Sequence, residues 1–287
     1  MKFVYEMETQ DPDDLFALAI LSSHLTSDLV GVLLTPGTRQ QVGLVRFLLS
    51  RMGKNVPIGS YSPDHTKQCV NGWWINFAET LGTWSPCSPD GLGHEILSSM
   101  ESSNVTVVTG SPPKNLAAYI HKQQSRIERW VGQGGYAGEC VPEERKLPKF
   151  RGVQVCPSFN FNGAPLGVLE LLASPKIGVR QLVSKDVCHG LLYDSKMHER
   201  VSPFKNKSGG LSVLYAGMAH YLSRNPQGKL FHDPLAVCAA INPDIIEWCE
   251  AEVYRTHGSW GSRPKSGTRT YVSIGANHEA FFEEMVR

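Results

Sequence analysis

An acidic cluster near the N-terminus, Glu8-Thr9-Gln10-Asp11-Pro12-Asp13-Asp14, offers the clearest chemistry in the sequence. Three aspartates within four residues repel one another, and their proximity is costly unless a positive group lies among them. Hard cations such as Ca²⁺ take carboxylate oxygens at this density. Asp13 and Asp14 could instead cap a helix and complement its dipole, but capping requires one or two acids, not a third behind a proline. The cluster therefore predicts a metal site.

The surrounding residues predict where this cluster lies in the fold. The apolar run Phe3-Val4-Tyr5 precedes it and is typical of a short buried strand. Apolar residues recur at helical spacing after it, so we expect an amphipathic helix to begin at about Asp13. The acids should therefore lie at the carboxyl end of a strand, at the junction with the helix that follows.

The rest of the chain alternates strands and helices. Such alternation predicts an α/β fold, with a mostly parallel, open, doubly wound central sheet flanked by helices, in a single domain over residues 1–287. Residues 61–91 are expected to be irregular, with Trp73, Trp74 and Phe77 either stacking on a base or packing the loop. The final third is expected to be mostly helical. The expected strands are 29–34, 56–59, 105–108, 127–131, 177–183 and 271–274, and the expected helices are 40–52, 92–100, one from Lys114, 165–173, 211–222 and 234–241.

Composition excludes several classes of partner. The formal net charge is +1 and no long basic run occurs, so nothing indicates a nucleic-acid surface. The longest apolar stretches fall short of a membrane span, and the N-terminus does not resemble a signal peptide. Seven cysteines without a Cys-x-x-Cys pair favour reduced thiols. We therefore expect a cytoplasmic protein that binds neither membranes nor nucleic acid, and we expect a homo-oligomer, either a dimer or a tetramer.

Four polar segments at predicted strand ends or helix starts could meet in one pocket, because ligands of parallel sheets bind beyond the carboxyl ends of the strands. They are the acidic cluster, Pro36-Gly37-Thr38, the turn from Thr109 to Asn115, and Phe231-His232-Asp233-Pro234.

These segments resemble motifs of the inosine-uridine-preferring nucleoside hydrolases. Asp11-Pro12-Asp13-Asp14, followed by Leu-Phe-Ala-Leu, is similar to the Asp-rich loop that holds Ca²⁺ in that family. Thr109-Gly110-Ser111-Pro112-Pro113-Lys114-Asn115 is similar to its Thr-Gly-Pro-Leu-Thr-Asn turn, and His232-Asp233-Pro234 matches its His-Asp-Pro. Asp90-Gly91-Leu92-Gly93 matches its Asp-Gly-Leu-Gly. The resemblance covers most of the chain, in the same order.

The resemblance implies a set of metal ligands. Ca²⁺ would be held by Asp14, Asp233 and the backbone carbonyl of Lys114, with Asp11 or Glu8 as the remaining carboxylate. The acidic loop is shorter than in the family and lacks a glycine before the paired aspartates. Asp11 is the preferred general base, and Glu8 is its rival.

The resemblance also implies substrate contacts. Asp13 and Thr38 would contact the ribose, Thr38 standing where the family has asparagine. Asn160 and Asn162 stand where the family has Glu-Phe-Asn, an exchange that removes one negative charge near the sugar. His232, next to Asp233-Pro234, is the preferred candidate donor to the leaving base, and a core histidine is the alternative.

Two functions follow. The first is Ca²⁺-dependent hydrolysis of the N-glycosidic bond of a ribonucleoside or modified nucleoside, releasing base and ribose in a salvage role. The alternative is a catalytically inactive protein of the same fold that binds a nucleoside or ribose. Cleavage of a nucleotide is disfavoured, because the pocket motifs contain no cluster of Arg or Lys to hold a phosphate.

Overall fold

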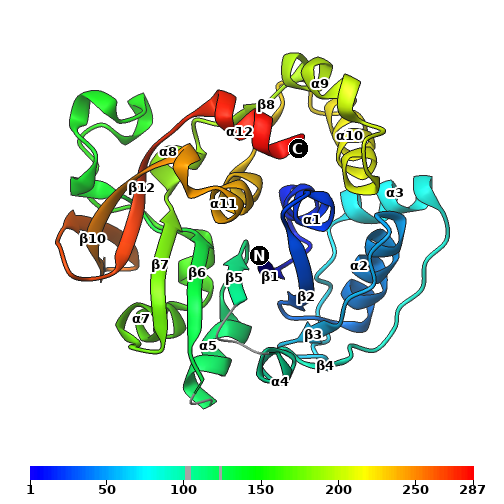
Figure 1. Ribbon diagram of the computed structural model, residues 1–287, viewed down its shortest axis with the longest axis horizontal. Coiled ribbons are helices and arrows are strands. Elements are labelled where there is room, and N and C mark those ends of the chain that lie inside the picture. Colours follow the sequence, from blue (N-terminus) through cyan, green and yellow to red (C-terminus); the bar gives the residue numbers. More distant parts are fainter. Residues whose placement is uncertain (101–104, 123–124) are drawn as a thin grey trace.

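A ten-stranded sheet forms the centre of the computed structural model, which describes residues 1–100, 105–122 and 125–287 (Figure 1). Its strand order is β11-β10-β12-β7-β6-β5-β1-β2-β3-β4, and β8 pairs with β9 separately. All neighbours from β12 to β4 run parallel, whereas β10 is antiparallel to both β12 and β11. The predicted mostly parallel sheet is therefore confirmed. The strands are β1 (Lys2–Met7), β2 (Asp28–Leu34), β3 (Ile58–Ser60), β4 (Gly91–Leu92), β5 (Val105–Thr109), β6 (Ile127–Gln133), β7 (Ile177–Val183), β8 (Leu192–Tyr193), β9 (Lys229–Leu230), β10 (Ile246–Thr256), β11 (Ser259–Pro264) and β12 (Thr270–Ala276).

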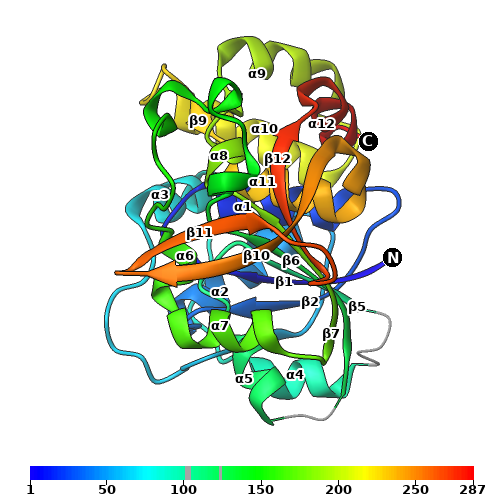
Figure 2. The same ribbon diagram turned by 90° about the vertical axis from the view of Figure 1, so that its left-hand side faces the viewer.

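Helices cover both faces of the sheet, as Figure 2 shows with α1, α10 and α11 on one side and α4, α5 and α7 on the other. Alternate residues of the central strand β1 serve the two faces: Phe3, Tyr5 and Met7 join one apolar cluster and Val4 joins the other. No helix in the described ranges is both long and apolar enough to cross a bilayer. The helices are α1 (Asp13–Ser23), α2 (Arg39–Arg51), α3 (Gly72–Leu81), α4 (Gly93–Ser99), α5 (Lys114–Lys122), α6 (Phe159–Gly163), α7 (Pro165–Ala173), α8 (Lys185–Cys188), α9 (Ser195–Val201), α10 (Gly209–Leu222), α11 (His232–Ile241) and α12 (His278–Met285), with 3₁₀ turns at Gly138–Cys140, Glu143–Arg145, Pro148–Phe150, Ser202–Phe204 and Pro243–Ile245.

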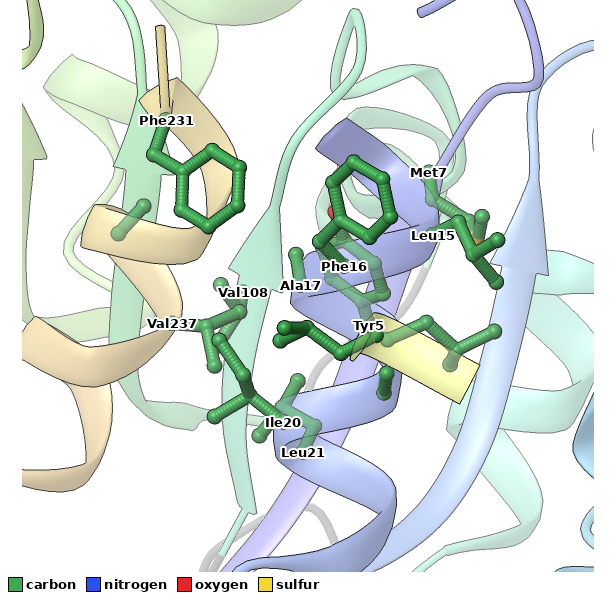
Figure 3. Packing of buried hydrophobic residues seen from close by; sticks show 14 of the residues in the cluster. Tyr5, Met7, Leu15, Phe16, Ala17, Ile20, Leu21, Val108, Phe231 and Val237 are labelled. Carbon is green, nitrogen blue, oxygen red and sulfur yellow. The ribbon is translucent and has the colours of Figure 1, made fainter. Parts of the chain in front are cut away.

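Helices α1 and α11 pack together over β1 and β5 in the larger apolar cluster (Figure 3). The ring of Phe16 on α1 stacks against Phe231, the residue before α11, with centroids 5.5 Å apart. Such aromatic pairs add stability beyond the area that they bury. Because the first residues of both helices carry aspartates, this packing fixes the relative positions of the acidic groups at the two helix starts.

Two expectations about secondary structure were wrong. The segment 61–91 contains α3, whose start is capped by the Asn71 side chain, and Trp74 and Phe77 of this helix are fully buried. These two rings therefore pack the core. The final third is not mostly helical, because β10, β11 and β12 form an antiparallel extension of the sheet. Its turn places His257 and Gly258 at positive φ, the geometry of a two-residue hairpin.

Candidate active site and metal centre

A pocket of about 340 Å³ opens at the carboxyl ends of the parallel strands β1, β5, β6 and β7. This volume lies in the range of small-molecule sites, and the position is where parallel sheets bind ligands. The pocket brings together three of the four polar segments that the sequence singles out. It is lined by Glu8, Gln10, Asp11, Asp13 and Asp14 before and within α1, by Gly110, Gln133 and Gly135 after β5 and β6, by Ser158, Phe159 and Asn160 around the start of α6, by Lys185 and His189 around α8, and by His232 and Asp233 of α11.

Three buried aspartates gather at the floor of this pocket. Carboxylate oxygens of Asp13, Asp14 and Asp233 lie within 4.8 Å of one another. Burial, followed by repulsion from neighbouring carboxylates, raises the pKa of both Asp14 and Asp233 well above the usual range. Such a cluster is stable in its charged form only beside a cation. Oxygen donors at this density fit a hard divalent ion.

Gly110 allows the end of β5 to approach this cluster. A Cβ atom at this position would lie 2.9 Å from the carboxyl carbon of Asp233 and 2.5 Å from the hydroxyl oxygen of Tyr5. Any side chain would therefore push Asp233 or Tyr5 away. The glycine of the Thr-Gly turn is thus required for the close arrangement around Asp233.

Both carboxylate oxygens of Asp13 contact other groups of the protein. Its Oδ2 atom accepts hydrogen bonds from the backbone N–H groups of His232 at 3.0 Å and Asp233 at 3.1 Å, so it caps α11. Its Oδ1 atom lies 3.4 Å from Nζ of Lys229. The residue expected to contact a ribose therefore ties α1 to α11, although it also lines the pocket.

Lys229 supplies a positive charge that sequence reasoning missed. Its buried ammonium lies 2.8 Å from Oδ1 of Asp11 and close to Asp13. Burial opposes the charged form, but Asp13 and Asp11 more than compensate and raise the pKa of Lys229. The only signal in the sequence is its place three residues before His232. Asp11, with its side chain 46% exposed, is thus an ion-paired carboxylate.

Glu8 faces the same pocket without such a partner. Burial, then repulsion from Asp11 and Asp13, raises the pKa of Glu8 to about 7, and Lys114 opposes the rise. Its backbone N–H donates to Oδ1 of Asp14 at 3.1 Å, which links it directly to the metal-site candidates. Within the described residues, no hydrogen-bond donor or basic side chain contacts its carboxylate.

Three residues that the resemblance implied are not among those lining this pocket. Thr38 caps α2, accepting a hydrogen bond from the backbone of Gln41, and borders a different surface depression. Asn162 donates to the backbone carbonyl of Gly258 and accepts from the indole of Trp260, both at 2.8 Å. Lys114 begins α5, and its influence on the pKa of Glu8 shows that it lies near the acidic cluster. The side chains of Thr38 and Asn162 are therefore occupied by structural hydrogen bonds.

Asn160 does reach the pocket, where neighbouring groups orient it. Its Nδ2 atom donates to the backbone carbonyl of Gly110 at 2.9 Å and to Oε1 of Gln133 at 2.7 Å. Gln133 was not singled out from the sequence, and neither was Phe159, whose ring is 73% exposed at this pocket. Phe159 is therefore an aromatic surface available to a ligand.

His232 lies at the wall of the pocket beside a second histidine. Its ring stacks on His189 with centroids 4.8 Å apart, and its buried Nε2 atom has no hydrogen-bond partner in the described structure. Burial, then the charge of Lys229, lowers the pKa of His232 to about 4. The imidazole is therefore neutral at pH 7 and available as a hydrogen-bond donor or acceptor to a ligand.

A further buried acid, Glu6, stabilises the structure next to the site. Its carboxylate accepts from the backbone N–H groups of Asn115 at 2.7 Å and Leu116 at 3.0 Å, and from the Asn115 side chain and the Thr35 hydroxyl. Burial raises the pKa of Glu6 to about 7 despite these donors. Glu6 thus anchors the start of α5 to β1. A glutamate inside an apolar strand was the available signal for it.

No family model matches the chain. An uncharacterized protein of Aquifex aeolicus (strain VF5) is 28% identical over 290 residues, which cover 97% of this chain and 96% of the relative.

Solved structures identify the architecture. A plant nucleoside hydrolase, the PpNRh1 enzyme, superposes with a TM-score of 0.75 at 15% identity, covering 99% of this chain and 97% of the neighbour. The chain has the nucleoside hydrolase fold. An inosine-uridine preferring nucleoside hydrolase from Bacillus anthracis matches with a TM-score of 0.71 at 18% identity over 100% and 98% of the two chains. A purine-preferring ribonucleoside hydrolase from Gardnerella vaginalis matches with a TM-score of 0.70 at 16% identity over 100% and 97%. The fold that the sequence motifs implied is confirmed.

Proposed function

We propose that this protein belongs to the nucleoside hydrolases and cleaves the N-glycosidic bond of a ribonucleoside or modified nucleoside in a Ca²⁺-dependent reaction, releasing free base and ribose. The observation that carries the proposal is the cluster of buried carboxylates at the floor of a pocket of nucleoside size, at the strand ends of a nucleoside hydrolase fold. A role in base salvage, a cytoplasmic location and a homo-oligomeric state stay predictions from the sequence.

Asp14, Asp233 and Glu8 are the residues proposed to hold the ion, because their carboxylates are the least engaged by the protein. Asp14 accepts one backbone N–H, whereas Asp11 and Asp13 share Lys229. The Lys114 carbonyl remains a proposed fourth ligand. Calcium, when bound, polarises an attacking water and orients sugar hydroxyls.

Glu8 is better suited than Asp11 to be the general base. Within the described residues no basic side chain contacts the carboxylate of Glu8 at the pocket, which leaves this carboxylate free to accept a proton from the attacking water. Burial and repulsion from Asp13 raise the pKa of Asp11 to about 6, but its ion pair with Lys229 opposes that rise and occupies the carboxylate, which makes it a less available proton acceptor. This reverses the preference for Asp11 that the sequence suggested, and it follows from a contact that the sequence does not reveal.

The remaining groups act on the sugar and the leaving base. The ionised carboxylates at the floor stabilise positive charge on the ring as the glycosidic bond breaks. The neutral imidazole of His232 can donate a hydrogen bond to the departing base, and Asn160 is held in place by Gln133 to orient the sugar. Asp13, Thr38 and Asn162 would contribute by positioning these elements, since their side chains hold α11, α2 and the β10–β11 hairpin.

A ribose-release assay across a panel of purine and pyrimidine nucleosides tests this proposal. We expect turnover of at least one nucleoside in Ca²⁺, its loss in excess EDTA, and its recovery when Ca²⁺ is restored. Magnesium at the same concentration is the control for ion type. A protein that binds nucleosides but releases no ribose under any condition would support the alternative, an inactive binding protein.

A further inference from the structure

The pocket has a positively charged end as well as an acidic floor. We propose that Lys185 and Lys149 at this end bind an anionic group on the substrate, either a phosphate on the ribose or a carboxylate on the base. This inference rests on the proposed function, because that function sets how the substrate lies in the pocket. It narrows the substrate class from nucleosides in general to those that carry a negative charge.

Lys185 lines the wall of the pocket that contains the two histidines, and Lys149 contacts one of these histidines, His189. Lys185 lines the pocket at the start of α8, and its Nζ atom donates to the backbone carbonyl of Pro157 at 3.0 Å. Nζ of Lys149 lies 2.6 Å from Nδ1 of His189, whose ring stacks on His232. Lys185 and the two imidazoles therefore belong to one wall of the pocket, and the ammonium of Lys149 lies beside His189 of that wall.

These two charges are not neutralised by the protein. In the described part of the chain, no carboxylate lies within 4.0 Å of Nζ of Lys149 or of Lys185. Lys229, in contrast, contacts Asp11 and Asp13, and Lys146 contacts Glu143. An anion entering the pocket would therefore meet the uncompensated ammonium of Lys185, with that of Lys149 next to His189.

The same wall could be read as a metal site, because ligand atoms of Cys188, His189 and His232 lie within 4.8 Å of one another. The charges of Lys149 and Lys185 act on both imidazole rings and disfavour positive charge there. A second cation at this position would be repelled by both ammonium groups. The wall therefore favours an anion.

Neutral groups beside Lys185 are compatible with an anion as well. The Ser158 hydroxyl accepts the backbone N–H of Gly135 at 3.0 Å, which leaves its own proton free to donate to a ligand. Asn160, which also lines the pocket, is neutral and adds no negative charge that would repel an anion. Sequence motifs gave no sign of this end, because Lys149 and Lys185 lie outside every motif and meet only in the fold.

A matched substrate series tests the proposal with Ca²⁺-loaded protein. We compare kcat/KM for uridine, for uridine 5′-monophosphate, which adds a phosphate to the ribose, and for orotidine, which adds a carboxylate to the base. One anionic compound should exceed uridine by about tenfold or more, the usual effect of a hydrogen bond to a charged group. That preference should fall about tenfold in Lys185→Gln, and further in Lys149→Gln/Lys185→Gln. Lys196→Gln, which changes an exposed lysine on α9 outside the pocket, is the matched control and should keep the preference.

The outcomes separate the two proposals. If uridine is cleaved at least as well as both anionic compounds, or if Lys185→Gln leaves their ratio unchanged, the anion site is refuted and the hydrolase proposal stands. If no compound is cleaved, either in this series or in the panel of purine and pyrimidine nucleosides, the hydrolase proposal fails. Binding then decides the anion site: calorimetry should show ribose 5-phosphate binding more tightly than ribose, or orotidine more tightly than uridine, with the difference lost in Lys185→Gln. Equal affinities within both pairs would refute it.

Discussion

Two buried carboxylates, Glu6 on β1 and Asp233 on α11, have very different hydrogen-bond surroundings in this fold. Glu6 accepts four hydrogen bonds, from the backbone and side chain of Asn115, the backbone of Leu116 and the hydroxyl of Thr35. Asp233 is equally buried, but among the described residues no group donates a hydrogen bond to its carboxylate, and its nearest charged neighbours include other acids. The protein therefore satisfies one buried charge itself and leaves the other unsatisfied.

The difference distinguishes a structural acid from a ligand-binding acid. A buried carboxylate with its own donors holds elements together, whereas one without donors is costly unless a cation arrives. The same contrast separates Asp11, which has Lys229, from Glu8, which has no basic partner in the described structure. The following experiments test whether a buried carboxylate without a donor or basic partner in the protein is a functional residue.

The largest effect is expected from replacing the unpartnered acid near the metal site. Glu8→Gln should lower kcat about 10²–10⁴-fold, the usual contribution of a general base, with a smaller change in KM. Asp11→Asn should reduce kcat less, because Lys229 already weakens this carboxylate as a proton acceptor. Steady-state kinetics on the best nucleoside of the panel measures both. A larger loss in Asp11→Asn would restore Asp11 as the base.

Metal binding should stabilise the wild-type protein through Asp233 and Asp14. With Ca²⁺ at about 100 times its dissociation constant, the gain is about 2.7 kcal/mol, or roughly 4–5 °C in Tm for a chain of 287 residues. Asp233→Asn removes a charge from the acidic cluster, so it should raise Tm in EDTA and abolish the response to Ca²⁺. Differential scanning calorimetry with and without Ca²⁺ checks this. An unchanged response in the variant would show that Asp233 does not bind the ion.

Glu6→Gln should have the opposite effect to Asp233→Asn: it should destabilise the protein and leave the response to Ca²⁺ unchanged. The amide replaces one accepting oxygen by a donor that faces the N–H groups of α5, which costs about 2 kcal/mol. Stability should therefore fall by a similar amount in EDTA and in Ca²⁺, as measured by urea denaturation. If the loss appears only in Ca²⁺, Glu6 is part of the ion's binding site and the contrast with Asp233 is wrong.

The stabilisation by Ca²⁺ should depend on pH in a direction that the pKa shifts set. The pKa of Glu8 is raised to about 7, and those of Asp14 and Asp233 are also raised, so the folded protein without Ca²⁺ holds protons that the unfolded chain has lost. These acids therefore lower apo stability as pH rises from about 4.5 to 7. Calcium must displace those protons. The difference in Tm between Ca²⁺ and EDTA should be small at pH 5 and grow towards pH 8; a constant difference would contradict the assignment.

Much of the fold could be predicted because its signals are local. The apolar run before Glu8 and the helical spacing after Asp13 define the strand-to-helix junction, and β1 and α1 have those positions. The Pro165–Ala173 helix and the Ile177–Val183 strand were predicted with their observed bounds. In each of these segments, the spacing of the apolar residues within the single helix or strand is enough to predict it.

The parts that could not be predicted depend on contacts between distant segments. Lys229 becomes a partner of Asp11 only when β9 lies beside the acidic loop. Thr38 and Asn162 have suitable side chains for a sugar, but the Gln41 backbone and Trp260 occupy them. Pairing of charges and orientation of amides are properties of the packed structure, and a residue's type does not encode them.

The hydrogen bonds of Asp13 also set an order for events during synthesis of the chain. Asp13 accepts from His232 and Asp233, which lie 219 and 220 residues further along. At the usual rate of about 5–20 residues per second, the ribosome needs on the order of 10–45 seconds to add them. Until then, the acids near the N-terminus remain hydrated beside an incomplete helix layer. The acidic pocket can therefore close only late in translation, so a truncated nascent chain should have no high-affinity ion site.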